Sequence, residues 1–398
     1  MPACSSSLSA LVPVTGADVS PPLPLSQVES IRLVAALKTV PDPRRRRGRR
    51  HGLQSVLLLA VQAVMAGAGS WVAIAQWAAT APQALGVCGT PPSASTFRRV
   101  LAAVDITAVE AALTTWVTGR QALGHRQRPA GTTAAEARTV LAVDGKTLRG
   151  SRDGHGQPTK LVSVYDHAHQ LVLTQAPVVA GDELAAFGVA LNTLPDLGGV
   201  LITADALHCQ RAHADYLAAH RGHYLFTVKG NQPLLRAALR RLPWAHAPGA
   251  RRRGTGHGRR ESRSVKVIDL DGTDAQALFP HARRAIKVIR RRRAGTAKPS
   301  VEIVYAITSL DHRAADPQLL ARWLQGHWAI ENRVHHVRDV TQREDASRIR
   351  LGTGPQMMAA LRNTATNIAR LAGHHNIAAA QRAAAWSPTA ITDALNTA

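Results

Sequence analysis

Three acidic residues have the type and placement to form one metal-binding cluster. Asp144 follows the apolar run 139–143, Asp205 follows the apolar run 200–204, and Glu331 lies in a stretch with helical character. Three carboxylates in a half-buried site repel one another unless divalent cations neutralise them. Oxygen ligands of this kind favour Mg²⁺, for which Mn²⁺ can substitute. On a strongly basic chain, such a pair of ions indicates chemistry on a phosphodiester backbone.

The charge balance favours a polyanionic partner. The 398 residues include 49 Lys and Arg against 26 Asp and Glu, which gives a formal net charge of +23, and the basic residues are clustered in runs. Coding bias explains why Arg displaces Lys, but it does not explain the scarcity of acidic residues. The composition therefore predicts nucleic acid as the partner, bound with a salt-sensitive affinity.

The cysteines and the first residues indicate a cytoplasmic protein. Cys4, Cys88 and Cys209 are scattered and have no CxxC spacing, so neither a disulfide framework nor a zinc site is expected. Residues 1–28 are rich in Ser and Pro and do not have the layout of a signal peptide. We expect this segment to be disordered.

One apolar segment, 53–68, follows a basic run in the way that a membrane span often does. Gln54, Ser55 and Gln62 interrupt it, and its uninterrupted stretches are shorter than the roughly 18 residues that suggest a span. The segment is better interpreted as a buried helix, and no membrane partner is expected.

The region before residue 121 is typical of a small all-α domain, because it has helical periodicity and no strand alternation. We expect this domain to span 29–120 and a Gly-, Pro- and Thr-containing linker to span 121–137. The helices are predicted over 31–38, 53–66, 71–79, 93–104 and 106–117.

The pattern then changes to α/β, and we expect a catalytic domain over 138–375. Three antiparallel strands followed by alternating helix and strand match the order of a ribonuclease H-like core, in which the first strand lies beside the end of the fourth. A β-rich insertion with exposed basic loops is expected over 240–310, and a partly helical tail over 376–398. The core elements are predicted as strand 139–146, hairpin 160–167 and 170–179, helix 183–194, strand 200–205, helix 210–220, strand 223–229, and helices 317–340 and 356–372.

The helix around Glu331 has two faces by its spacing. The apolar face, directed to the core, comprises Trp323, Ile330, Val334 and Val337. The adjacent polar stripe comprises His327, Glu331, His335 and Arg338. In this arrangement Glu331 would supply a metal ligand and Arg338 would hold a phosphate. Two alternatives stay open: Glu331 is a surface residue that pairs with His335, or the third ligand comes from Glu344 or Asp345.

Several motifs follow one another along the chain: LAVDGKTLRG at 141–150, TADALH at 203–208, VKGNQ at 228–232, VEIVYAITSL at 301–310 and GHWAIENR at 326–333. In this order they resemble the DDE transposases of bacterial insertion sequences, in the ISAs-type group, over roughly residues 30 to 385. The basic run at 42–51 and the helix after it resemble the DDE-associated helical domain of that group.

The resemblance implies a catalytic and metal-binding triad of Asp144, Asp205 and Glu331. It also implies two-metal phosphoryl transfer, with DNA cleaved at the element ends and joined to target DNA. A homodimer in a synaptic complex and a bacterial, nucleoid-associated location would follow. Placement near the site or in the basic run predicts DNA contacts, against the alternative of ordinary surface charge, for Lys146, Arg149, Lys229, Arg338, Arg44, Arg45, Arg46 and Arg47.

The sequence departs from the family pattern near Glu331, at Gln325, His336 and Gln342. A catalytically decayed transposase that acts as a DNA-binding protein is therefore an alternative function. A ribonuclease H-like nuclease that cuts without joining is another. Detection of cleavage and of strand-transfer product distinguishes the three.

Overall fold

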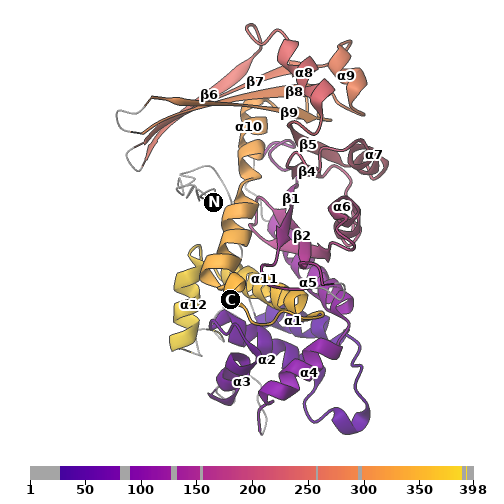
Figure 1. Cartoon of the computed structure of the whole chain (residues 1–398), viewed down its shortest axis with the longest axis vertical. Coiled ribbons are helices and arrows are strands. Elements are labelled where there is room, and N and C mark those ends of the chain that lie inside the picture. Colours follow the sequence, from indigo (N-terminus) through magenta and orange to yellow (C-terminus); the bar gives the residue numbers. More distant parts are fainter. Residues whose placement is uncertain are drawn as a thin grey trace. The chain divides into compact units, whose positions relative to one another are not determined.

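The computed structural model describes residues 27–80, 90–126, 132–152, 156–256, 259–294, 298–387 and 391 (Figure 1). The segment expected to be disordered, 1–28, lies outside these residues up to position 26. The chain forms two compact units. The core unit contains the described residues up to 203, together with 219–222 and those from 326 onward, and the ribbon unit contains 204–218 and 223–325.

The core unit begins with the predicted helices. They are α1 (Gln27–Lys38), α2 (Leu53–Met65), α3 (Trp71–Thr80), α4 (Ala94–Ala103) and α5 (Ile106–Arg126), with the short 3₁₀ turn η1 (Arg46–Gly48) before α2. Helix α4 starts where Ser93 accepts a hydrogen bond from the Thr96 N–H, a typical N-cap. Helix α5 continues to Arg126, so the first part of the predicted linker is helical.

Helix α2 is buried over most of its length, which confirms the interpretation of segment 53–68 as a buried helix. Among the described residues, no single helix is long and apolar enough to cross a membrane. A pair made of α4 and the first part of α5 passes by length and composition, but it is bent by 88°.

The sheet of the core unit has the predicted strand order. It contains β1 (Val140–Thr147), β2 (Lys160–Asp166), β3 (Val172–Pro177) and β4 (Leu201–Ala204), in the order β3-β2-β1-β4. The first three strands are antiparallel. Helix α6 (Glu183–Leu191) follows β3. At the edge strand β3, the Asn367 side chain bonds both the N–H and the C=O of Val172, which satisfies backbone groups that an edge leaves unpaired.

Two C-terminal helices complete the core unit, α11 (Gly354–Leu371) and α12 (Ile377–Trp386). Every residue of α11 is buried, and the helix contacts α2, α5 and β3. Because one helix packs against both the N-terminal helices and the sheet, the predicted all-α segment and the sheet belong to the same compact unit.

The segment around Glu331 is wound differently from the single α-helix predicted over 317–340. Helix α10 ends at Gly326 (Pro317–Gly326), and two π-helical stretches follow, η3 (Glu331–His335) and η4 (Val337–Thr341), before the 3₁₀ turn η5 (Glu344–Ala346). The wider ring is visible where the His336 N–H donates to the Glu331 carbonyl and the Gln342 N–H to the Val337 carbonyl. Such π-helical turns often occur at functional sites.

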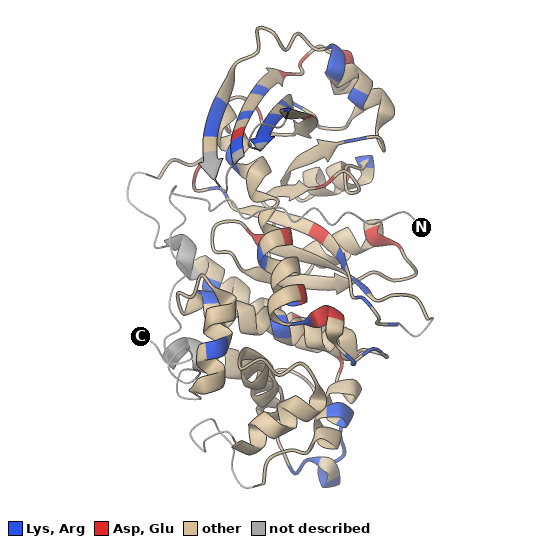
Figure 2. Cartoon of the chain, turned by 60° about the vertical axis from the view of Figure 1, so that its left-hand side comes forward, with Lys and Arg blue, Asp and Glu red and all other residues tan. Residues whose placement is uncertain are grey.

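The ribbon unit confirms the predicted β-rich insertion. Its sheet has the order β5-β9-β8-β7-β6, and neighbouring strands in it are antiparallel. Figure 2 shows Lys and Arg distributed along these strands. The elements are α7 (Arg211–Ala219), β5 (His223–Val228), α8 (Pro233–Arg241), β6 (Gly249–Gly256), β7 (Arg259–Asp269), α9 (Asp274–Leu278), β8 (Arg284–Ala294), β9 (Ser300–Thr308) and α10.

Candidate active site

Strand β1 carries the first acidic residue of the site. Asp144 follows the apolar run 139–143 and lies inside β1 opposite Ser163, because pairing with β2 continues through Thr147, close to the predicted strand end at 146. A side chain at the next position, Gly145, would collide with the carboxylate of Glu183. Glycine therefore allows the strand to continue past Asp144 beneath that buried side chain.

The π-helical stretch η3 holds the second acidic residue beside β1. Ile330 and Val334 are 1% and 2% exposed and anchor this stretch on the sheet. They form one apolar cluster with a residue from each of β1, β2 and β3, namely Ala142, Tyr165 and Val172. This packing leaves the Glu331 carboxylate at the surface of the cluster, with 56% of its side chain exposed.

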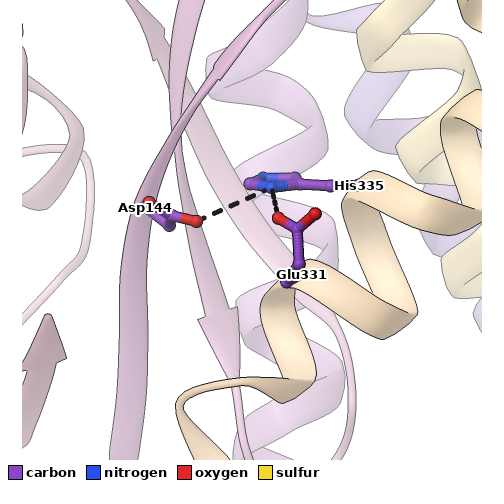
Figure 3. Close-up of side chains that lie close together, drawn as sticks. All are labelled: Asp144, Glu331 and His335. Atoms are coloured by element: carbon purple, nitrogen blue, oxygen red, sulfur yellow. Dashed lines mark hydrogen bonds and ion pairs between the residues drawn. The ribbon is translucent and has the colours of Figure 1, made fainter. Parts of the chain in front are cut away.

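Asp144, Glu331 and His335 lie close together (Figure 3). His335 Nδ1 is 2.8 Å from Glu331 Oε2 and 3.6 Å from Asp144 Oδ2. A pair between Glu331 and His335 was predicted in the alternative that makes Glu331 a surface residue, and the structure contains this pair. The proximity of His335 to Asp144 had no sequence signal, because it depends on the packing of η3 against β1.

The electrostatics of the cluster keep Glu331 ionised. The hydrogen bond from His335 lowers the pKa of Glu331 below its ordinary value, against the opposing effect of partial burial. The positive charge of Lys146 acts in the same direction. An ionised carboxylate accepts hydrogen bonds, so His335 donates from Nδ1.

The donor set fits a divalent cation. Asp144, Glu331 and His335 each offer one ligand atom, and these atoms all lie within 4.8 Å of one another. His335 Nε2 is buried and makes no hydrogen bond in the described structure. The two carboxylates suit Mg²⁺ or Mn²⁺ better than the imidazole does. Asp144 and Glu331 would therefore hold the ion, and His335 orients Glu331.

Lys146 points to the same side of β1 as Asp144, because the two residues are separated by one position on a strand. It is 8% exposed, and its Nζ donates to Asp339 Oδ2 at 2.6 Å. The Lys146 ammonium, predicted to contact DNA, is therefore paired with the Asp339 carboxylate of η4. Arg149, by contrast, is 80% exposed, and its Nη1 is 3.4 Å from Asp345.

Arg338 is not at the surface where a phosphate contact was predicted. It is 1% exposed, and its Nε and Nη2 donate to the two carboxylate oxygens of Glu344, each at 3.0 Å. Arg362 of α11 donates to the same carboxylate at 2.9 Å. Burial alone would raise the pKa of Glu344, but the two guanidinium groups overcome it and hold the pKa below its ordinary value.

This arrangement bears on the rival ligands as well. The Glu344 oxygens are enclosed by two arginines, so Glu344 is unsuited to bind a metal ion. Burial and the neighbouring Asp339 raise the pKa of Asp345. Glu331, which lies with Asp144 and His335 in one cluster, stays the predicted third carboxylate.

The remaining predicted residues belong to other segments of the chain. Asp205 belongs to the ribbon unit, directly after β4, and its Oδ1 accepts a hydrogen bond from the Leu207 N–H. Lys229 is exposed after β5 in the same unit. The guanidinium of Arg44 binds Asp42 at 2.8 Å and the His51 carbonyl at 2.7 Å, which shapes the basic run. The other three predicted contacts in that run, Arg45, Arg46 and Arg47, are exposed.

Comparison with known families decides the affiliation of the chain. The family described as "Transposase DDE domain" matches residues 135–368, and the family described as "DDE_Tnp_1-associated" matches residues 34–117. The chain belongs to the DDE transposase family. Its α/β fold, with a ribonuclease H-like core and an N-terminal helical region, is the fold expected from the sequence.

Relatives of this DDE transposase extend over most of its length. It is 30% identical over 357 residues to the "Putative transposase YncI" of Escherichia coli O157:H7, covering 85% of the chain and 87% of the relative. It is 28% identical over 359 residues to the "H repeat-associated putative transposase YhhI" of Escherichia coli K12, covering 86% and 91%.

A solved structure shares a slight likeness with the chain. It is a piggyBac transposase synaptic complex with hairpin DNA, at 12% identity and a TM-score of 0.37, covering 94% of the chain and 77% of the other. A likeness of this size bears neither on the fold nor on the function.

Proposed function

We propose that this transposase cleaves DNA strands at the ends of its own insertion sequence and transfers them to target DNA, with Asp144, Asp205 and Glu331 as the acidic triad. The family membership supports the reaction class. The observation that carries the proposal is the convergence of Asp144 and Glu331, from distant parts of the chain, on one cluster with His335.

The chain's own residues would have distinct roles. Asp144 and Glu331, with Asp205, would hold Mg²⁺, with Mn²⁺ as a substitute, and the bound ions would activate water or a DNA 3′ hydroxyl and neutralise the leaving oxygen. His335 fixes the orientation of the Glu331 carboxylate through its Nδ1–H. Lys146 holds Asp339 of η4 against β1 and adds positive charge beside the cluster. No protein nucleophile is required.

The DNA contacts follow from exposure. Arg149 and Lys229, together with the exposed arginines of the basic run, are accessible to a phosphate backbone, whereas Lys146 and Arg338 act by positioning carboxylates. Synapsis of two element ends would require two copies of the chain, so we propose a homodimer on DNA.

The experiment measures cleavage and joining of labelled DNA that carries the element's own ends, with Mg²⁺ or Mn²⁺. The variants Asp144→Asn, Asp205→Asn and Glu331→Gln should lose both activities and retain DNA binding. Asp196→Asn is the matched control, because Asp196 is a carboxylate of the core unit that is 66% exposed and pairs loosely with Arg221. Cleavage that survives all three triad substitutions would reject the proposal.

The alternative of a decayed, DNA-binding transposase rests on the residues near Glu331 that depart from the family pattern. Gln342 is 8% exposed, and its Nε2 donates to the Arg362 carbonyl at 3.2 Å and to Thr366 Oγ1 at 3.1 Å. Its amide N–H is thus accommodated by α11, and His336 is exposed. These two departures leave Asp144 and Glu331 in contact with His335. DNA binding by the parent chain without any cleavage would favour the decayed alternative.

A further inference from the structure

The distal part of the ribbon unit carries many arginines on adjacent antiparallel strands. Strands β6, β7, β8 and β9 pair in sequence-adjacent order, and their basic residues are visible in Figure 2. Because side chains alternate between the two faces of a sheet, the register assigns each arginine to one face or the other.

The two faces are defined by cross-strand rows. One row joins Arg252, Arg263, Arg290 and Glu302. The next row joins Arg253, Ser262, Arg291 and Val301, and therefore lies on the opposite face. The face with the first row, which we call the paired face, has Arg252, Glu261, Arg263, Arg290, Arg292 and Glu302. The other, which we call the open face, has Arg251, Arg253, Arg260, Arg291 and Arg293.

On the paired face, acidic residues offset much of the charge. Glu261 lies 2.8 Å from Arg290, 3.1 Å from Arg263 and 3.6 Å from Arg292. Arg290 also lies 3.9 Å from Glu302. Three guanidinium groups therefore share one central carboxylate.

The open face has a different environment. Its five arginines are exposed, and in the described part of the chain none of them forms an ion pair. The residues in register with three of them are small or apolar: Arg251 faces Ser264, Arg253 faces Ser262, and Arg291 faces both Ser262 and Val301. The other two, Arg260 and Arg293, face each other. Val301 and Ile303 are 56% and 49% exposed on this face.

The lysines of the same face have other partners, which limits the open face to its distal part. Lys287 lies over the Trp244 ring at 5.7 Å from its centroid. Lys266 donates to the Ala245 carbonyl at 2.9 Å. Trp244 and Ala245 thus contact the lysines of this face, and the five arginines of the open face lie farther along the strands from this contact.

We propose that the open face binds the phosphate backbone of duplex DNA without reading its sequence, an inference that rests on the proposed function. Exposed guanidinium groups bind phosphate oxygens bidentately and release counterions when they do so. Arg253 and Arg291 lie in one row on strands separated by β7, so their Cα atoms are two strand spacings, about 10 Å, apart.

The experiment measures binding of the full chain to labelled duplexes by fluorescence anisotropy at a series of salt concentrations. The open-face variant is Arg253→Ala with Arg291→Ala, and the matched control is Arg263→Ala with Arg290→Ala on the paired face, where both arginines pair with Glu261. Both variants remove two positive charges from the same pair of neighbouring rows, so long-range attraction falls equally. A further variant, Arg253→Lys with Arg291→Lys, retains the charge.

The open-face variant should bind on the order of 10- to 100-fold more weakly near 0.1 M salt, and the slope of log K against log salt should decrease by about 1.8. The control and the lysine variant should retain nearly the parent slope. The loss should be equal on a random duplex and on a duplex that carries the element end. Equal weakening by the open-face variant and the control would overturn the proposal, as would a loss confined to the element-end duplex.

The result is separable from the test of the proposed function. Binding is measured without cleavage, and Asp144→Asn should bind with the parent slope. If cleavage is absent but the open-face effect is present, the DNA-binding face stands and the catalytic proposal fails. If cleavage depends on the triad but both double variants bind alike, the catalytic proposal stands and the open face is rejected.

Discussion

Replacing Glu344 by glutamine removes the carboxylate that lies between two buried guanidinium groups. Glu344, Arg338 and Arg362 are 4%, 1% and 2% exposed. Removal of one member of such a buried ion group leaves uncompensated charge in the interior, which costs about 3–5 kcal/mol. We therefore expect the free energy of unfolding of Glu344→Gln to fall by about that amount.

Urea unfolding followed by circular dichroism measures the effect. With a slope of about 3 kcal/mol per molar urea, the midpoint should fall by roughly 1–1.7 M. Glu302→Gln is the control, because Glu302 is 61% exposed and 3.9 Å from Arg290, and exposed pairs contribute less than about 1 kcal/mol.

A third variant tests the reason for the loss. Combining Glu344→Gln with Arg338→Met and Arg362→Met removes all three charges, so it should recover much of the stability lost in Glu344→Gln. A fall of less than about 1 kcal/mol in Glu344→Gln, or a triple variant less stable than the single one, would refute the reasoning. Because the pKa of Glu344 is lowered in the folded state, its ionised form stabilises the fold at pH values above the pKa of the unfolded state. This stabilisation is lost as the pH falls through the pKa of the folded state.

Two further predictions concern the cluster and a buried acid. His335→Ala should lower the single-turnover cleavage rate by about 10- to 100-fold at saturating DNA, with DNA affinity unchanged. His335→Asn should recover part of the lost rate. Equal cleavage rates in His335→Ala and the parent would contradict the positioning role of His335. Burial raises the pKa of Glu110 to about 7, from 4.5, despite hydrogen bonds from Gln175 and Gln356. Protonation of Glu110 thus stabilises the fold fully below pH 4.5, and this stability is lost as the pH rises toward 7. Glu110→Gln should remove a pH dependence of the free energy of unfolding worth up to roughly 3 kcal/mol, measured by urea unfolding at pH 4.5 and 7.5. If the free energy of unfolding changes as much between these two pH values in the variant as in the parent, the burial argument is contradicted.

The elements of the fold were largely predictable from residue periodicity. The apolar run before Asp144, the hairpin after it and the helices from α2 to α5 each have a local pattern that the structure confirms. The succession of three strands and then alternating helix and strand matched a ribonuclease H-like core, and this match supplied the order of the strands. Short-range pattern was sufficient here because strands β1, β2 and β3 follow one another along the chain.

The details of the site depend on contacts that no local pattern encodes. The prediction for Arg338 assumed an α-helix with a solvent-facing polar stripe, whereas η3 and η4 are π-helical and Arg338 is buried against Glu344. That burial requires Arg362 from α11, which is distant in sequence. The proximity of His335 to Asp144 likewise follows from the packing of Ile330 and Val334 on the sheet.

The most direct test of the central claim is the rate of single-turnover strand cleavage, with Mg²⁺ and the element's own ends, in Glu331→Gln and Asp345→Asn. Loss of a ligand carboxylate removes roughly 4 kcal/mol of transition-state stabilisation, so Glu331→Gln should cleave about a thousand-fold more slowly than the parent. Asp345→Asn should remain within about tenfold of the parent. Cleavage at the parent rate by Glu331→Gln, with cleavage abolished in Asp345→Asn, would contradict the assignment of Glu331 to the acidic triad.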